Sequence, residues 1–129
     1  MTVLTHRPSL VLLLEDNFII GLALEDDLRD QGYRVEVVSS CAAALEWLRT
    51  FTPDAAILDV SLNGEICRDV ADQLHATGVP FLVYSARRVD EGLLPTYPGV
   101  AWLEKPAHRT LLLAALQRLL EPCQPASRP

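Results

Sequence analysis

Five polar residues lie at the ends of short apolar runs and could together bind a phosphoryl group. In chain order they are Glu15, Asp16, Asp59, Ser85 and Lys105. A carboxylate can accept a phosphoryl group as an acyl phosphate, and Asp59 lies between the acid pair (Glu15 and Asp16) and the lysine. The ammonium of Lys105 and the hydroxyl of Ser85 can donate hydrogen bonds to the other phosphoryl oxygens. The residue types therefore favour Asp59 as a nucleophile in phosphoryl transfer.

A divalent cation is expected beside the three carboxylates. If Glu15, Asp16 and Asp59 converge, their negative charges repel one another. Mg²⁺ is the usual compensation, because it prefers oxygen ligands and often bridges carboxylates to phosphate, and Mn²⁺ is the alternative. The sequence has no glycine-rich phosphate-binding loop, so we expect no bound nucleotide.

The lysine is unusual in this composition. The chain has 11 basic residues, and Lys105 is the only lysine among them. An ammonium is a compact point charge, whereas a guanidinium is a planar fork. Lys105 is therefore a candidate for a role that an arginine cannot fill, although composition alone supports a chance survivor equally well.

Each of these residues has an ordinary explanation when it is taken alone. An acid pair after an apolar run is often a feature of a helix N-terminus. Asp59 could be a turn or cap residue, Ser85 a loop serine and Lys105 a solvated charge. Their occurrence together at the ends of successive runs is what favours one shared site.

The elements that must position these residues alternate between strand and helix. Strands are predicted at residues 10–14, 33–38, 55–58, 81–84 and 100–103, and helices at 17–31, 41–49, 67–76 and 107–120. Between residues 87 and 99 the prolines and glycines leave room only for a short helix, at most 89–94. Strict alternation requires a parallel α/β sheet with helices on both faces, whose functional residues gather at the carboxyl ends of the strands.

Length and charge limit the classes of protein that the chain can belong to. Its 129 residues suffice for one domain, with a core at about residues 10–120 and a proline-rich tail at 122–129 that we expect to be disordered. The net charge of −6 argues against a nucleic-acid partner, because phosphate binding needs a basic patch. No apolar run approaches the roughly 18 residues needed to span a membrane.

The cysteines indicate a reducing compartment. Cys41, Cys67 and Cys123 are odd in number, and no two of them are close in sequence. We therefore expect neither a disulfide framework nor a metal-binding cysteine motif. Together with the absence of a signal-peptide pattern, this predicts a cytoplasmic location.

As a set, four segments resemble the receiver domains of bacterial response regulators. They are VLLLEDN around the acid pair, AAILDVSLNG around Asp59, FLVYSA around Ser85 and WLEKPA around Lys105. The resemblance extends from about Leu10 to Leu120 and implies a receiver domain over residues 1–121. It also implies a doubly wound, CheY-like (flavodoxin-like) five-stranded parallel sheet of strand order 2-1-3-4-5, with a short or degenerate fourth helix.

The same resemblance implies a role for each site residue. Asp59 would be the phospho-acceptor, and Glu15, Asp16, Asp59 and the backbone carbonyl of Ser61 would hold the metal ion. Ser85 would be the switch hydroxyl and Lys105 the phosphoryl-binding lysine. The chain is most similar to stand-alone receivers of alphaproteobacterial type, on the segments LEDNFIIGLALEDDL, LDVSLNGE, VPFLVYSAR and LEKPA.

Four positions after the fourth strand depart from that pattern or extend it. Ser85 and Ala86 stand where the sub-family often has threonine and glycine. Trp102 occupies the position of the switch aromatic, and it either moves on activation or packs permanently against the last helix. Arg87 comes two residues after Ser85, and it could either contact the phosphoryl group or be a solvated loop arginine.

The function that these expectations support is a phosphorylation-driven switch in a two-component system. It would take a phosphoryl group from a histidine kinase or phosphotransfer protein and act through contacts with a downstream protein. A receiver-like interaction module that works without phosphorylation is the alternative, and the sequence leaves open whether the chain forms a homodimer. We do not expect an enzyme, because a phosphatase of the dehalogenase-like type needs a second aspartate where this chain has Ser61.

Overall fold

The computed structural model describes residues 8–59, 67–85, 100–104 and 109–121. Its strands are β1 (Leu10–Leu14), β2 (Arg34–Val38), β3 (Ala55–Asp59), β4 (Phe81–Ser85) and β5 (Ala101–Glu104). Its helices are α1 (Phe18–Asp30), α2 (Cys41–Leu48), α3 (Arg68–Ala76) and α4 (Arg109–Leu120). These bounds agree with the sequence prediction within two residues, and the expected short helix at 89–94 lies outside the described residues.

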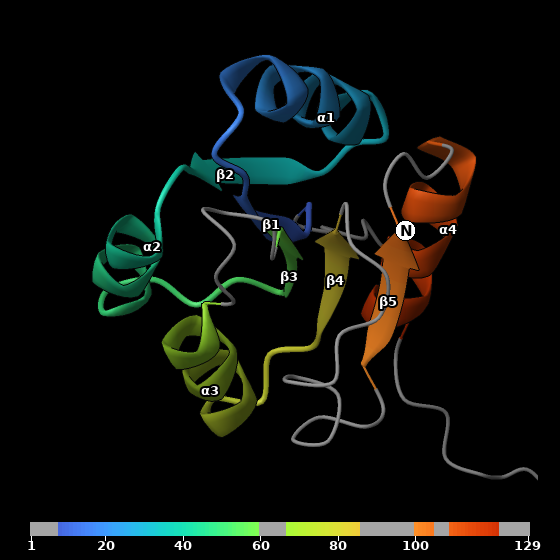
Figure 1. The fold of residues 1–129 in the computed structure, drawn as a ribbon. Coiled ribbons are helices and arrows are strands. Elements are labelled where there is room, and N and C mark those ends of the chain that lie inside the picture. The colour runs from blue at the N-terminus through green and yellow to red at the C-terminus, as the bar shows by residue number, and fades with distance from the viewer. Residues whose placement is uncertain (1–7, 60–66, 86–99, 105–108, 122–129) are drawn as a thin grey trace, which may run out of the picture.

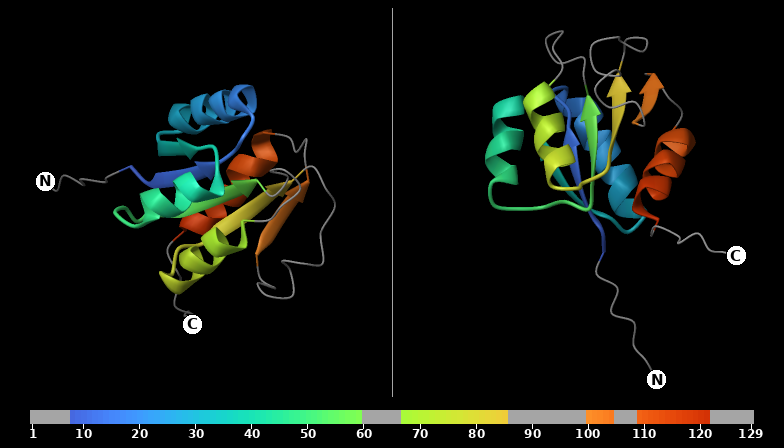
Figure 2. Two further views of the ribbon diagram at one scale, coloured as in Figure 1. Left: turned by 60° about the vertical axis from the view of Figure 1, so that its left-hand side comes forward. Right: turned by 90° about the horizontal axis from the view of Figure 1, so that it is seen from below.

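The five strands form one parallel sheet in the order β2-β1-β3-β4-β5. This confirms both the fold class and the strand order, with β2 at one edge and β5 at the other (Figure 1). In Figure 2 the strands point the same way, so their carboxyl ends share one edge of the sheet. Of the functional residues predicted at strand ends, the structure thereby brings Glu15, Asp16, Asp59 and Ser85 to that edge.

The alternation of side chains along each strand divides the core into two layers. On one face, strand residues such as Leu12, Leu58 and Val83 pack with Ala44 of α2 and Leu74 of α3. On the opposite face, the intervening strand residues pack with α1 and α4. The buried members of this second layer are Val11, Leu13, Val35, Ala55, Ile57, Leu82 and Tyr84 from the strands, with Leu24, Leu28, Leu112 and Leu116 from the helices.

Local signals in the sequence account for the ends of the helices. The side-chain oxygen of Asn17 accepts a hydrogen bond from the Ile20 amide and begins α1, and Ser40 does the same for the Ala43 amide at α2. Gly32 and Gly78 follow α1 and α3 with φ of 93° and 75°, a region that a side chain disfavours.

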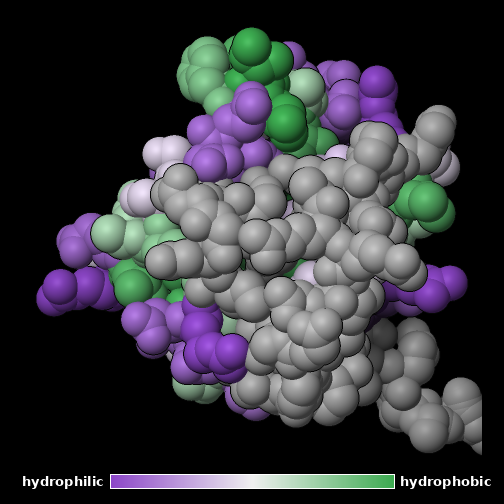
Figure 3. Space-filling view, in the orientation of Figure 1, coloured by the Kyte–Doolittle hydropathy of each residue, from purple (hydrophilic) through white to green (hydrophobic). Residues whose placement is uncertain are grey.

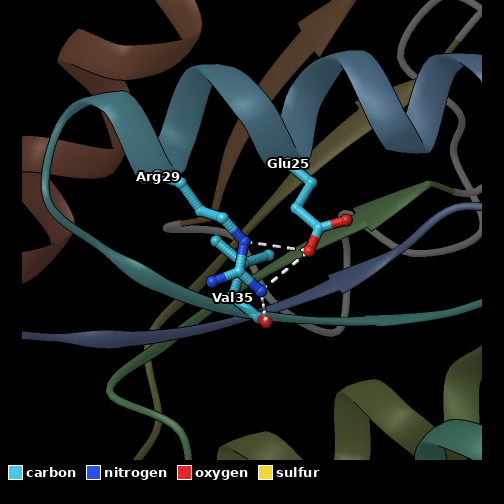
Figure 4. A network of polar contacts seen from close by, with 3 residues as sticks. All are labelled: Glu25, Arg29 and Val35. Atoms are coloured by element: carbon cyan, nitrogen blue, oxygen red, sulfur yellow. Dashed lines mark hydrogen bonds and ion pairs between the residues drawn. The ribbon is translucent and has the colours of Figure 1, made fainter.

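Two arginines, Arg29 and Arg109, connect α1 to its neighbouring elements. Both Nε and Nη2 of Arg29 donate to Oε2 of Glu25, at 2.9 and 2.7 Å, and Nη2 also donates to the carbonyl oxygen of Val35 at 3.1 Å (Figure 4). This joins α1 to the edge strand β2. On the other side, Nε of Arg109 in α4 lies 3.1 Å from Oδ2 of Asp27 in α1. Both contacts fix the helix that begins directly after the acid pair.

The cysteine expectation is wrong in one respect. Cys41, the first residue of α2, and Cys67, the residue before α3, form a disulfide although they are 26 residues apart in sequence. Sequence distance was the wrong criterion, because α2 and α3 pack side by side on one face of the sheet and bring their starts together (Figure 1). Cys123 lies outside the described residues.

No helix in the described ranges is both long enough and apolar enough to cross a membrane.

Candidate functional site

Strand register brings the predicted site positions to one edge of the sheet. Leu14, the last residue of β1, is paired with Leu58 of β3, so Glu15 and Asp59 each come one residue later on neighbouring strands. Asp59 is in turn level with Tyr84, and Ser85 at the end of β4 is level with Glu104 of β5. The backbone therefore places the acid pair, Asp59 and Ser85 at consecutive strand ends.

The two members of the acid pair have different environments. Glu15 is buried, with 2% of its surface exposed, whereas Asp16 is exposed. The Glu15 amide donates to the carbonyl of Val38 at 3.0 Å, which extends the β1–β2 ladder by one residue. Its carboxylate oxygen Oε2 accepts a hydrogen bond from the amide of Asn17 at 3.2 Å. Glu15 is thus held in place by the backbone around it, and Asp16 is presented to solvent.

A cavity of about 460 Å³ opens beside the acid pair. Its lining comes from α1 and from the ends of β1 and β2, and its polar part includes Glu15, Asp16, Glu25 and Ser39. Apolar lining comes from Phe18, Gly21, Leu22 and Val37. The cavity is therefore lined by both acidic and apolar side chains.

Next to this cavity, the first turns of α1 expose large apolar side chains. Phe18 and Ile19 are each 76% exposed and Leu22 is 47% exposed, and we call these three residues the α1 patch. Figure 3 shows a hydrophobic surface over α1 at the top of the view. The α1 patch was not singled out from the sequence. The signal was the run Phe18-Ile19-Ile20, because one helix face cannot bury three consecutive residues.

Other predicted site residues are only partly described or lie outside the described residues. For Asp59 and Ser85 the structure gives the backbone position, which is the carboxyl end of β3 and β4. Ser61, Ala86, Arg87 and Lys105 lie outside the described ranges. Their roles stay predictions.

Trp102 packs on the opposite face from the one expected for a tryptophan held by the last helix. It contacts the core layer of α2 and α3, whereas its neighbours Ala101 and Leu103 contact the layer of α1 and α4. Packing of Trp102 against the last helix is therefore wrong, because alternation along β5 turns its side chain to the other face. Its indole Nε1 is buried and has no hydrogen-bond partner among the residues that the structure describes. Whether the ring moves stays open.

The donor chemistry at this edge fits a hard divalent cation. The acid pair offers carboxylate oxygens, the ligands that Mg²⁺ prefers, and one of the two faces solvent, where a metal ion can keep bound water. Among the side chains that the structure describes, no group of three metal-ligating residues gathers, and the side chain of Asp59 is not in that set. Of the expected metal ligands, the structure therefore describes the side chains of Glu15 and Asp16.

The strand order of this sheet and the acidic residues at its carboxyl edge are typical of a class of signalling domains. A family model, the response regulator receiver domain, matches residues 11–117, and the chain belongs to that family. It is 36% identical over 121 residues to the transcriptional regulatory protein AfsQ1 of Streptomyces coelicolor, which covers 88% of this chain and 51% of AfsQ1. The chain therefore spans about half the length of this relative.

Solved receiver domains have the same fold. The non-phosphorylated HemR receiver domain of Leptospira biflexa is 26% identical, with a TM-score of 0.79 over 94% of this chain and 100% of that one. The receiver domain of the sensor histidine kinase PA1611 from Pseudomonas aeruginosa is also 26% identical, with a TM-score of 0.74 over 88% and 98%. In that structure a magnesium ion is coordinated in the active-site cleft.

Proposed function

We propose that this receiver domain accepts a phosphoryl group on Asp59 from a histidine kinase or a phosphotransfer protein. The observation that carries the proposal is the register of the strand ends, which puts Asp59 one strand away from the buried Glu15 and level with the end of β4. In the transfer, a carboxylate oxygen of Asp59 attacks phosphorus, a P–O bond forms and the P–N bond of the donor phosphohistidine breaks. The histidine leaves as the neutral imidazole once it is protonated.

The acceptor needs its charge offset before an anionic phosphoryl group can approach. Glu15, Asp16, Asp59 and the backbone carbonyl of Ser61 would hold Mg²⁺, or Mn²⁺, at this edge. The bound ion would screen negative charge on the phosphoryl oxygens. The Asn17 amide already donates a hydrogen bond to the Glu15 carboxylate, so this side chain would reorganise little when the ion binds.

The remaining residues of the site would bind the transferred group. Lys105 would pair with one phosphoryl oxygen, and the Ser85 hydroxyl would donate to another. Ala86 and Arg87 follow Ser85 directly, so their backbone or side chains would lie within reach of the same group. Movement of Ser85 and Trp102 would then report phosphorylation to the surface.

The partner class follows from the surface beside the site. The α1 patch puts apolar side chains next to the acidic strand ends, and exposed apolar surface of this kind favours a protein partner. We propose that the chain makes no direct contact with nucleic acid, because its net charge is −6. The relative AfsQ1 is named a transcriptional regulatory protein, and this chain spans about half of its length. We propose contacts with an unidentified downstream protein as the output.

The finer placement rests on the sequence alone. We propose a stand-alone receiver of alphaproteobacterial type, located in the cytoplasm, with the receiver domain at residues 1–121 and no enzymatic turnover of its own. The segments around the acid pair, Asp59 and Lys105 support this. A drain for phosphoryl groups and an output regulator are both compatible with such a domain, and so is a homodimer.

Acyl phosphate formation tests the proposal directly. The full chain is incubated with acetyl phosphate and Mg²⁺, and intact mass measures the phosphorylated fraction. We expect one phosphoryl group per chain, lost on chelation of the metal and absent from Asp59→Ala, while Asp54→Ala, a change at an exposed aspartate before β3, retains it. Equal labelling of Asp59→Ala and the unmodified protein would contradict the proposal and favour an interaction module that needs no phosphorylation.

A further inference from the structure

The Cys41–Cys67 disulfide lies at the same edge of the sheet as the acceptor aspartate. Cys41 begins α2 directly after β2, and Cys67 is the residue before α3, which follows β3. In a parallel sheet, a helix that follows a strand starts at that strand's carboxyl end, so both cysteines are at the edge where Asp59 ends β3. Seven residues separate Asp59 from Cys67 in the sequence.

The two backbones are placed for a disulfide without rearrangement. Their Cα atoms are 5.7 Å apart, within the range that disulfides require. Both residues pack against the core layer shared by α2 and α3, so neither is on a loop that could carry it away. The packing of both cysteines on this core layer therefore favours their proximity.

The two cysteines differ in burial, and this difference sets which of them reacts first in thiol–disulfide exchange. Cys67 is buried, with 5% of its surface exposed, whereas Cys41 is partly exposed. A soluble reagent therefore reaches Cys41 first, and Cys67 is the internal thiol that resolves the intermediate.

We propose that Cys41 and Cys67 are a reversible thiol–disulfide couple that controls phosphoryl acceptance at Asp59. The oxidant is a small disulfide of the glutathione class. The Cys41 thiolate attacks it, an S–S bond forms to Cys41 and one small thiol leaves. The Cys67 thiolate then attacks Cys41 in this mixed disulfide and a second small thiol leaves. Two electrons pass to the oxidant, and the two protons of the cysteines end on the released thiols.

Oxidation adds a covalent link between the start of α2 and the start of α3, at the sheet edge where Asp59 ends β3. Cys41 comes three residues after Val38, whose carbonyl accepts a hydrogen bond from the Glu15 amide, so the link also lies close in sequence to the acid pair's support. Two helices that are covalently linked adjust less readily around an incoming phosphoryl group, so the oxidised form accepts it more slowly. This effect on acceptance rests on the proposed function, whereas the couple itself does not.

Alkylation and mass mapping test the couple. The full chain carrying Cys123→Ser, which removes the third thiol, is equilibrated over a range of glutathione redox buffers and then alkylated. We expect a peptide cross-link between Cys41 and Cys67 that disappears toward the reducing end. Absence of the cross-link across the whole range would overturn the proposal, whatever Asp59 does.

Phosphorylation kinetics test the control. The same protein is labelled with acetyl phosphate and Mg²⁺ in its oxidised and reduced states, which need no further substitution. We expect acceptance to be about fivefold slower when oxidised, the lower end of usual coupling between sites. Cys41→Ala with Cys123→Ser is the matched control and should show one rate in both buffers. Equal rates in the oxidised and reduced protein would overturn the regulatory role, while labelling that fails in both states is a failure of the proposed function alone.

Discussion

At the scale of single residues, Lys105 separates the effect of charge from the effect of shape. The chain uses arginine for every other basic position, so Lys105→Arg keeps the charge and replaces a point donor with a planar fork. We expect acyl phosphate formation from acetyl phosphate to slow by about tenfold or more, because a misplaced donor no longer meets the phosphoryl oxygen. Intact mass over time measures the rate.

The reverse exchange at a distant position is the control for Lys105. Arg118, in the last turn of α4, becomes lysine in Arg118→Lys, and we expect no change in rate. If Lys105→Arg also reacts at the unaltered rate, the lone lysine is a chance survivor of composition.

Trp102 offers a second test at the residue scale, through its buried nitrogen. A buried N–H without a partner costs about 1–3 kcal/mol, so its removal offsets part of the loss of ring surface. We expect Trp102→Phe to lower the free energy of unfolding by less than about 1 kcal/mol, and Trp102→Ala to lower it by about 3 kcal/mol or more. Urea denaturation measures both. A loss in Trp102→Phe of about 2 kcal/mol or more would mean that the indole nitrogen is hydrogen-bonded in the folded protein.

At the scale of elements, α1 contains a glycine that its helix does not require. A Cβ at Gly21 would lie 3.6 Å from Cγ of Glu15 and from Cγ1 of Val37, ordinary contact distances. We expect Gly21→Ala to raise the free energy of unfolding by about 0.5–1 kcal/mol, since glycine is a poor helix former. Chemical denaturation with urea measures the change.

Gly32 supplies the matched control for that substitution. It follows α1 with φ of 93°, where a side chain is strained, so Gly32→Ala should destabilise by about 1 kcal/mol although the space around it is open. A loss of stability in Gly21→Ala would mean that the Glu15 side chain cannot yield even slightly at the start of α1.

The elements were largely predictable because their signals are local. Apolar runs of four or five residues marked the buried strands, and Asn17, Ser40, Gly32 and Gly78 marked helix ends through caps and backbone conformation. The face on which Trp102 packs was not predictable in this way. Alternation tells which strand residues share a face, but only the packed helices decide which helix that face meets.

At the scale of the whole molecule, the disulfide contributes to stability as well as to regulation. It closes a loop between residues 26 apart, which reduces the entropy of the unfolded chain by an amount worth about 3 kcal/mol. We expect a reducing agent to lower the free energy of unfolding of the native protein by about that amount. Thermal and urea denaturation with and without reductant measure it.

The double variant Cys41→Ala, Cys67→Ala controls for effects of the reductant itself. Its stability should be the same in both conditions. A stability of the native protein that does not respond to reductant would mean that the bridge is not formed before denaturation.

The candidate site was predictable in part, for a reason that belongs to the whole sheet. The alternation of strands and helices predicts a parallel sheet whose carboxyl ends share one edge, and the resemblance to receiver domains implies the strand order, so the convergence of Glu15 and Asp59 could be expected before any coordinates. The Cys41–Cys67 pair could not, because it depends on how two helices pack across a face and on no spacing in the sequence. The α1 patch was not predicted, because helical periodicity indicates which residues α1 buries.

The contact between Arg29 and β2 also bears on how copies of this molecule behave toward one another. Val38 turns its carbonyl inward to Glu15, so Val35, three residues earlier, turns its carbonyl to the open side of the edge strand. An unpaired strand edge is a template for strand addition and fibril growth. Arg29 occupies the Val35 acceptor, and Arg34 and Glu36 add charged side chains to the same short strand. The hydrogen bond from Arg29 to Val35, which joins α1 to β2, thereby also protects this sheet edge against aggregation.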